Sequence, residues 1–350
     1  MFLAALAAAG LGTVLATASS SPGHASRAQV PLGRCSGGSA PAVAFSVPLP
    51  GRPGQMLLSK GTLWVAIWGV RWGRPGRLLA LQPNSGRLLR TIRLPITPMR
   101  FVAGFGSLWL TGAGGGRRYS GVLQLDPRSG RVLRVIRGAH ALGSALAATR
   151  RIVWVAGADT FPPGHEERSG VYFVYRIDPR QGAVVDRVRL PRSTSIDLVG
   201  DGPAVWVTGW RAVPKLSEAG RVLFRQPIVG SGWSIARAGE GVWVTHTFYG
   251  SRRDRNPPPA RELLRIREHS KPHLTRIQLE ESPWEVSSAA GVAWVAAGED
   301  THQVLRLVDT RAPSIPTAVP VPGGIVQGIQ AVRNGAWVSQ VKPNRLSKIC

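Results

Sequence analysis

The chain has 350 residues with a formal net charge of +25, and its 42 glycines and 28 prolines make up about a fifth of it. This content is below the low-complexity range and suits a fold with many turns. The cations, nearly all arginine, either decorate a solvated surface or attract polyanions. The sequence contains no recognisable nucleic-acid-binding module and no dense basic run, which argues against nucleic acid as a partner.

The first forty residues indicate export. Residues 1–18 are apolar and uncharged and end in the small-x-small pattern Ala16-Thr17-Ala18, which predicts a signal peptide. A positively charged start is missing, so a membrane anchor is the alternative, although the run is short for a span. We expect a flexible linker over 19–40, a folded domain over 41–350, and a protein that is secreted or held in the cell envelope.

An apolar-Trp-apolar triplet recurs along the folded part of the chain. The tryptophans of the seven copies, 37 to 52 residues apart, are Trp64, Trp109, Trp154, Trp206, Trp243, Trp294 and Trp337. Self-similarity at such a period is the mark of a repeat architecture, and the variation is expected of units that differ in loop length. We expect each repeat tryptophan to fill space between neighbouring units.

A hairpin signature follows most of these tryptophans. Residues 122–136 give an alternating strand, a Pro-x-x-Gly turn and a second alternating strand, and 78–92 and 174–188 repeat the pattern. Proline presets one turn dihedral and glycine accepts a positive φ. Each unit therefore has one strand before the tryptophan, one that contains it and two in the hairpin. Four short strands per repeat predict an all-β fold, a seven-bladed β-propeller.

The two ends of the repeat region complement each other. After Trp337 only one more strand is expected, at 345–349, whereas 42–47 is one strand too many before Trp64. The N-terminal strand is therefore expected to close the last blade as its outer strand. This arrangement puts Cys35 and Cys350 at the same hairpin end, where a predicted disulfide would replace the missing turn. Two free thiols are the alternative.

The repeat resembles that of the YVTN-type and streptogramin-lyase-like propellers, which share an x-Trp-Val … apolar-x-Asp-Pro-x-Ser/Thr-Gly-x-Val blade. The resemblance covers about 43–350 and implies the fold, whereas related propellers include lyases and sensors. A lyase of this family would be expected to carry an acid, with a histidine nearby, just after the repeat tryptophan. The third residues after the seven tryptophans are Ile67, Gly112, Gly157, Gly209, His246, Ala297 and Gln340. Only His246 is ionisable, which puts elimination chemistry in doubt.

One face of the predicted propeller is the candidate binding surface. The loops before each innermost strand and after each tryptophan strand should open on it, and all five tryptophans outside the repeat position map there. The predicted ligand-binding residues are Trp68, Trp72, Arg100, Trp210, Trp233, Tyr249 and Trp284. Aromatic rings beside arginines suit sugar rings, lipid heads or peptides. A hydrophobic lid over the central channel is the alternative.

The central channel itself provides a second candidate site. Counting back nine or ten residues from each repeat tryptophan gives the lining residues Gln55, Arg100, Ser144, Ile196, Ser234, Glu285 and Gly328. Glu285 is the only acid among them. With His246 and His302 on neighbouring loops, it could bind a divalent metal or transfer protons, although their spacing carries no ligand signature.

These features favour a binding module over an enzyme. We expect a monomer whose partner is a protein, a glycan or an anionic cell-envelope polymer, recognised by an Arg/Trp-rich loop face. The alternative is a metal-assisted lyase or hydrolase that uses His246, Glu285 and His302. No cofactor other than that metal is indicated.

Overall fold

A computed structural model describes residues 41–71, 73–114, 119, 121–139, 145–158, 172–190, 197–247, 261–268, 273–299, 302–311, 313, 317–321 and 323–350. They belong to the unit Leu32–Cys350. They form β-strands and connections without an α-helix, so this part of the chain has no helix with the length and hydrophobicity to cross a bilayer. The predicted export segment, the linker and Cys35 lie outside the described residues.

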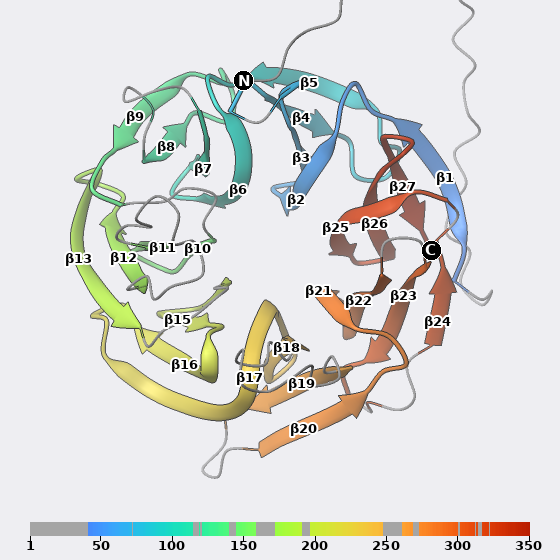
Figure 1. The fold of residues 1–350 in the computed structure, drawn as a ribbon. Coiled ribbons are helices and arrows are strands. Elements are labelled where there is room, and N and C mark those ends of the chain that lie inside the picture. Colours follow the sequence, from blue (N-terminus) through green and yellow to red (C-terminus); the bar gives the residue numbers. More distant parts are fainter. Residues whose placement is uncertain are drawn as a thin grey trace, which may run out of the picture. The chain divides into compact units, whose positions relative to one another are not determined.

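The described strands form antiparallel sheets in which consecutive strands pair. Five sheets have four strands and one has seven. The seven-stranded sheet contains β17 (Val222–Ala238), whose first half pairs with the strand before it and whose second half pairs with the strand after it. It is therefore outermost in one blade and innermost in the next. With β17 counted in both halves of its sheet, the described strands divide into seven sets of four. We treat each set as a blade, and the sets follow one another around a ring (Figure 1).

The strands take four positions in the blades. Besides β17, the inner strands are β2 (Pro53–Ser59), β6 (Thr97–Gly104), β10 (Leu146–Ala148), β14 (Leu198–Asp201), β21 (Pro283–Ala289) and β25 (Ile325–Val332). The second strands are β3 (Thr62–Ile67), β7 (Ser107–Ala113), β11 (Val153–Ala158), β15 (Ala204–Val207), β18 (Gly241–Thr247), β22 (Val292–Glu299) and β26 (Gly335–Val341). The third strands are β4 (Arg77–Leu81), β8 (Val122–Leu125), β12 (Tyr172–Asp178), β16 (Trp210–Ser217), β19 (Glu262–Arg267), β23 (His302–Asp309) and β27 (Arg345–Ile349). The outer strands besides β17 are β5 (Leu88–Arg93), β9 (Val132–Ile136), β13 (Ala183–Leu190), β20 (His273–Gln278), β24 (Thr317–Pro320) and β1 (Val43–Pro48).

The ring of blades is closed by the N-terminal strand, as predicted. Each inner strand contacts the next one, and β25 of the last blade contacts β2 of the first. In the last blade β1 pairs antiparallel with β27, with Val43 opposite Ile349 and Pro48 opposite Arg345. Two further backbone hydrogen bonds join Ala42 and Cys350, at 2.9 and 3.1 Å. The fold is therefore an all-β propeller whose first strand completes its last blade.

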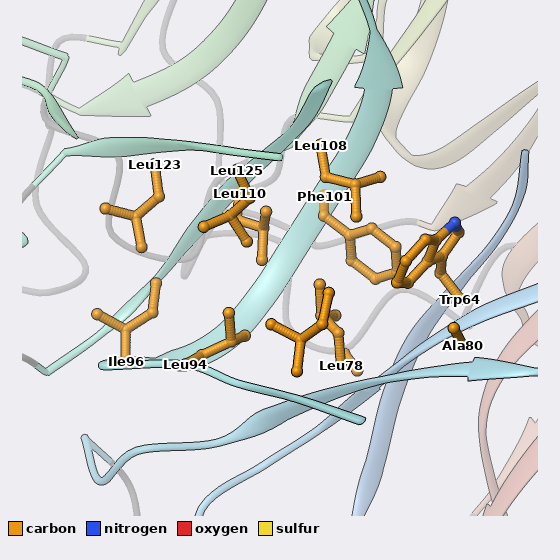
Figure 2. Packing of buried hydrophobic residues seen from close by; sticks show 12 residues of the cluster. Trp64, Leu78, Ala80, Leu94, Ile96, Phe101, Leu108, Leu110, Leu123 and Leu125 are labelled. Atoms are coloured by element: carbon orange, nitrogen blue, oxygen red, sulfur yellow. The ribbon is translucent and has the colours of Figure 1, made fainter. Parts of the chain in front are cut away.

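The repeat tryptophans are the largest parts of the core. All seven lie on second strands, and their side chains are between 0% and 4% exposed. Figure 2 shows the contact between the first two blades, where Trp64 and Leu78 of one blade meet Phe101 and Leu108 of the other. Burial of such apolar surface between neighbouring blades explains why a single blade is not stable alone.

In the first four blades a hairpin glycine lies close against the outer strand of the preceding blade. Gly130 has a φ of +74° in the turn between β8 and β9, a backbone conformation that glycine adopts without strain. A Cβ at this position would lie 2.9 Å from Cγ2 of Ile92, in the outer strand of the preceding blade. The Pro-x-x-Gly turn therefore serves both the hairpin and the contact between blades.

Candidate functional site at the channel mouth

The blades have two different ends. Short turns join the first strand to the second and, in the first four blades, the third strand to the fourth, and we call that end the turn side. The connections from second to third strands, and from one blade to the next, lie at the opposite end, which we call the loop side. Inner strands begin at the loop side, so Gln55, Arg100, Ser234 and Glu285, each near the start of its inner strand, lie there.

A change of register recurs where the inner strands begin. It occurs between Pro53 and Met56, Pro98 and Arg100, Gly232 and Ile235, Pro283 and Glu285, and Val326 and Gly328. A β-bulge leaves residues outside the regular ladder and re-aims their side chains. Here it frees side chains at the channel end of the strand for contacts with the next blade.

Side chains at these positions bridge successive inner strands. The N–H groups of Phe101, Ile235, Val286 and Ile329 donate to Gln55 Oε1 (2.6 Å), Asp197 Oδ2 (3.2 Å), Ser234 Oγ (3.4 Å) and Glu285 Oε1 (3.3 Å), respectively. Each bond joins the start of one inner strand to the next. These bonds link the first blade to the second and the fourth to the seventh in series, and we call these polar residues the collar of the loop-side channel mouth.

Asp197 is a collar residue that the sequence analysis missed. Its carboxylate accepts hydrogen bonds from the Ile235 N–H and from Ser234 Oγ, the latter at 3.3 Å. A strict count of nine residues back from Trp206 reaches Asp197, and the same count finds Gln55, Arg100, Ser234, Glu285 and Gly328. The count of ten points instead to Ile196 and Ser144, which lie outside the described residues. A constant spacing was the signal that would have found Asp197.

The collar has an unusual acid in Glu285. Burial raises the pKa of its carboxyl to about 7, and the nearby charge of Asp197 acts in the same direction. The Arg100 guanidinium and the hydrogen bond from Ile329 oppose this rise. The carboxyls of Glu285 and Asp197 and the guanidinium of Arg100 thus interact electrostatically at the channel mouth.

We expect Glu285→Gln to stabilise the protein at high pH. Because the folded pKa of Glu285 is above its ordinary value of 4.5, the folded state loses stability as pH rises from about 4.5 to about 7. The variant should therefore match the wild type near pH 4.5 and exceed it near pH 8, by at most roughly 3 kcal/mol. Urea unfolding at both pH values measures this. The exposed Glu299→Gln is the control, and an equal gain for both variants would contradict the assignment.

Trp68 directly follows β3 on the loop side of the first blade. The guanidinium of the exposed Arg52 lies 4.5 Å from the centroid of the Trp68 ring. Arg52 also donates to Gln327 Oε1 in the last blade, at 3.0 Å. A Cβ on Gly54 would come within 2.5 Å of Trp68 Nε1, so glycine allows the ring to lie against the start of β2. Arg52 and Trp68 thus form a fixed cation–π pair where the first and last blades meet.

The other predicted tryptophans that belong to the described residues also lie on the loop side. Trp233 and Trp284 lie within the bulges of β17 and β21, and Trp233 is 36% exposed. Trp210 begins β16, with its backbone opposite Ser231. Trp72 and Tyr249 lie outside the described residues.

His246 is engaged in the interior of the fifth blade. Its side chain is 3% exposed, with Nδ1 3.1 Å from Glu262 Oε2 and Nε2 in contact with the Val229 carbonyl oxygen. His302 begins β23, with its backbone opposite Glu299. Within the described ranges no three His, Cys, Asp or Glu side chains are placed to hold a metal ion. The side chain of His302 lies outside the described part of the chain.

Comparisons with known proteins define the fold. No protein-family model matches the chain, and no curated protein matches it in sequence. Hydrazine synthase of Kuenenia stuttgartiensis has a similar structure, with a TM-score of 0.67 and 12% identity over 87% of this chain and 97% of that one. Virginiamycin B lyase from Staphylococcus aureus gives a TM-score of 0.62 and 13% identity over 87% and 98%. The Pan2 WD40 domain of Neurospora crassa gives 0.65 and 12% over 88% and 94%.

These similarities confirm the streptogramin-lyase-like propeller fold that the repeat implied. At such low identity they show the fold alone, because the three propellers differ in what they do.

Proposed function

We propose that this propeller is an extracytoplasmic binding module whose loop side recognises an anionic glycan polymer of the cell envelope. The observation that carries the proposal is the Arg52–Trp68 pair, held at the channel mouth by Gln327. An indole ring stacks on the apolar face of a sugar. A guanidinium beside it forms charge-assisted hydrogen bonds with a carboxylate or phosphate substituent. Together they select for charged sugars.

Charge around the pair supports an anionic ligand. Arg71 and Arg74 are exposed in the connection that follows Trp68, and Arg211 is exposed at the loop-side start of β16. A propeller used as a binding or scaffold module fits the diverse roles of this fold.

The extracytoplasmic setting rests on the two ends of the chain. An apolar segment over 1–18 predicts export, and a Cys35–Cys350 disulfide is expected only outside the reducing cytosol. The Ala42–Cys350 backbone pair holds Cys350 beside the strand that follows Cys35. We include that disulfide in the proposal.

Trp68→Ala and Arg52→Gln should each weaken binding to an anionic glycan polymer such as alginate at least tenfold. Removing the ring or the charge deletes one half of the recognition pair. Arg52 is exposed and Trp68 is half-buried at the loop side, outside the packed contacts between blades, so the melting temperature should change little. Surface plasmon resonance on immobilised polymer and thermal unfolding measure the two effects. Arg128→Gln, an exposed arginine of the turn side, is the matched control.

Salt provides an independent check, because attraction between exposed charges is screened over about 8 Å at physiological ionic strength. Binding should fall steeply between about 0.05 and 0.5 M NaCl. A flat salt response, or variants that unfold rather than lose affinity, would mean that the tryptophan is a lid over the channel and not a recognition element.

A further inference from the structure

Apolar side chains are exposed on the outer strands of four consecutive blades. We call this surface the rim patch, and its apolar members are Leu88, Leu89, Leu133, Val185, Val222 and Leu223. Each is between 42% and 59% exposed. The described outer strands of the other three blades, β20, β24 and β1, have no large hydrophobic residue with comparable exposure. The patch is thus confined to one part of the ring, which scattered surface residues would not be.

The position of these residues in their strands is regular. They are the second and third residues after the turn glycines Gly86, Gly130, Gly182 and Gly220. At about 3.3 Å per residue they lie within roughly 10 Å of the turns. Phe105, which is 41% exposed, adds a ring from the turn between β6 and β7 on the same side. A flat surface placed against the turn side could therefore contact all of them at once, although they belong to four blades.

Cations alternate with the apolar residues. The exposed arginines of the rim patch are Arg87, Arg90, Arg131, Arg134, Arg187 and Arg221. The only acid in the outer strands of these four blades is Asp186, and it is paired with Arg176 at 2.9 Å. Nearby Asp126 and Asp178 use their carboxylates to accept turn N–H groups. The rim patch therefore carries a net positive charge.

From this juxtaposition we propose that the turn side of the first four blades docks on a lipid bilayer rich in anionic phospholipid. Aliphatic side chains that reach a few ångströms into the headgroup region, between arginines that pair with anionic headgroups, are what interfacial binding requires. A polyanionic polymer would use the arginines and leave the leucines without a role. A second copy of the chain would bring one positive edge against another, which cationic edge strands oppose. Docked in this way, the propeller presents its loop side away from the membrane.

Co-sedimentation of the full chain with vesicles tests this. The readout is the ratio of binding to phosphatidylglycerol-containing vesicles over binding to pure phosphatidylcholine vesicles, because residues 1–18 are apolar and could partition into either. The wild type should bind the anionic vesicles far more tightly. Arg87→Gln/Arg131→Gln/Arg221→Gln should bind them roughly 100-fold more weakly, at about fivefold per arginine. Leu89→Ser/Leu133→Ser/Leu223→Ser should lose roughly tenfold or more through its smaller apolar contact.

The matched control is Arg52→Gln/Arg71→Gln/Arg74→Gln, which removes the same charge from the loop side and should keep vesicle binding within about twofold. Equal losses in the control and the rim variants would overturn the docking surface, and so would a leucine variant that binds like the wild type. Dimerisation in light scattering without vesicle binding would assign the patch to a second copy.

Hydrogen exchange on the wild type tests the docking surface without any substitution, so it decides the question even if a variant does not fold. Anionic vesicles should slow exchange in β5, β9 and β13 and leave β20 and β24 unchanged, and uniform rates would contradict the proposal. Because the loop-side control should lose glycan binding and keep lipid binding, failure of this inference is distinguishable from failure of the proposed function.

Discussion

Cys350→Ser is expected to lower the free energy of unfolding by about 5 kcal/mol, the value that the chain-entropy model gives for a disulfide closing a loop of some 300 residues. The last blade explains why the effect should be so large. Its outer strand β1 and its third strand β27 come from opposite ends of the chain. No other covalent bond joins β1 to the last blade, because the backbone connects β1 to β2 of the first blade instead. Detachment of β1 exposes the edge of β27 and the indole ring of Trp337, whose centroid lies 5.4 Å from that of Phe45 in an edge-on contact.

Guanidinium chloride unfolding of the wild type with and without a reductant measures this prediction. The reduced wild type should match Cys350→Ser, because both lack the cross-link, and reductant should not change the variant. Peptide mapping under non-reducing conditions provides the direct observation. Recovery of unlinked Cys35 and Cys350 peptides from native protein would exclude the disulfide, whereas a linked pair with a small stability effect would show that hydrogen bonds between β1 and β27 suffice to close the ring.

The sequence predicts most of this fold because its information is periodic. The spacing of the tryptophans and the Pro-x-x-Gly turns defines the blades. The extra strand at the N-terminal end supplies the outer strand that the last blade lacks. The continuous strand β17 is different, since one strand there serves two blades. Residues 228–231 contain no proline and no pair of glycines that would interrupt the strand. The repeat pattern of a single blade does not show that one strand can belong to two blades.

The burial of cations beside the repeat tryptophans is the part that the sequence pattern hides. On the third strands, a cation lies directly opposite the repeat tryptophan in four blades, in the pairs Trp154–Arg176, Trp206–Lys215, Trp243–Arg265 and Trp337–Lys348. In an alternating strand such a cation looks solvated. The structure instead buries Arg265 and Lys348, to 4% and 5% exposure. Burial lowers the pKa of the Lys348 ammonium to about 8, which shows how little water reaches it.

The sequence predicted Gln55, Arg100, Ser234 and Glu285 at the channel, but it missed Asp197 and the hydrogen bonds that link these residues. The residue types of the collar are ordinary, and a polar residue at the start of a strand is usually solvated. Glu285 and Asp197 become distinctive only when a bulge and the next inner strand bring an N–H group to each carboxylate. The loop-side placement of Trp68, Trp233 and Trp284 was predictable, since it depends only on which end of a blade each connection occupies.

Trp109→Ala is expected to cost about 3–5 kcal/mol of unfolding free energy, the usual range for removing a fully buried aromatic side chain. Trp109 is completely buried between the second and third blades and donates its Nε1–H to the Gly104 carbonyl oxygen at 3.0 Å. The contact surfaces on both sides are flat sheets held in a closed ring, so they cannot collapse into the cavity and the loss should lie near the upper end of this range.

The matched substitution Trp233→Ala removes an equal volume from a ring that is 36% exposed at the channel mouth. Its cost should be well below that of Trp109→Ala, because much of the lost side chain already contacts water. Denaturant unfolding of both variants compares them directly. Equal costs would mean that the loop-side tryptophans are as much a part of the core as the repeat tryptophans, and the surface that we assign to ligand binding would then be structural. A much larger cost for Trp109→Ala would show that the repeat tryptophans belong to the core and that the loop-side tryptophans do not.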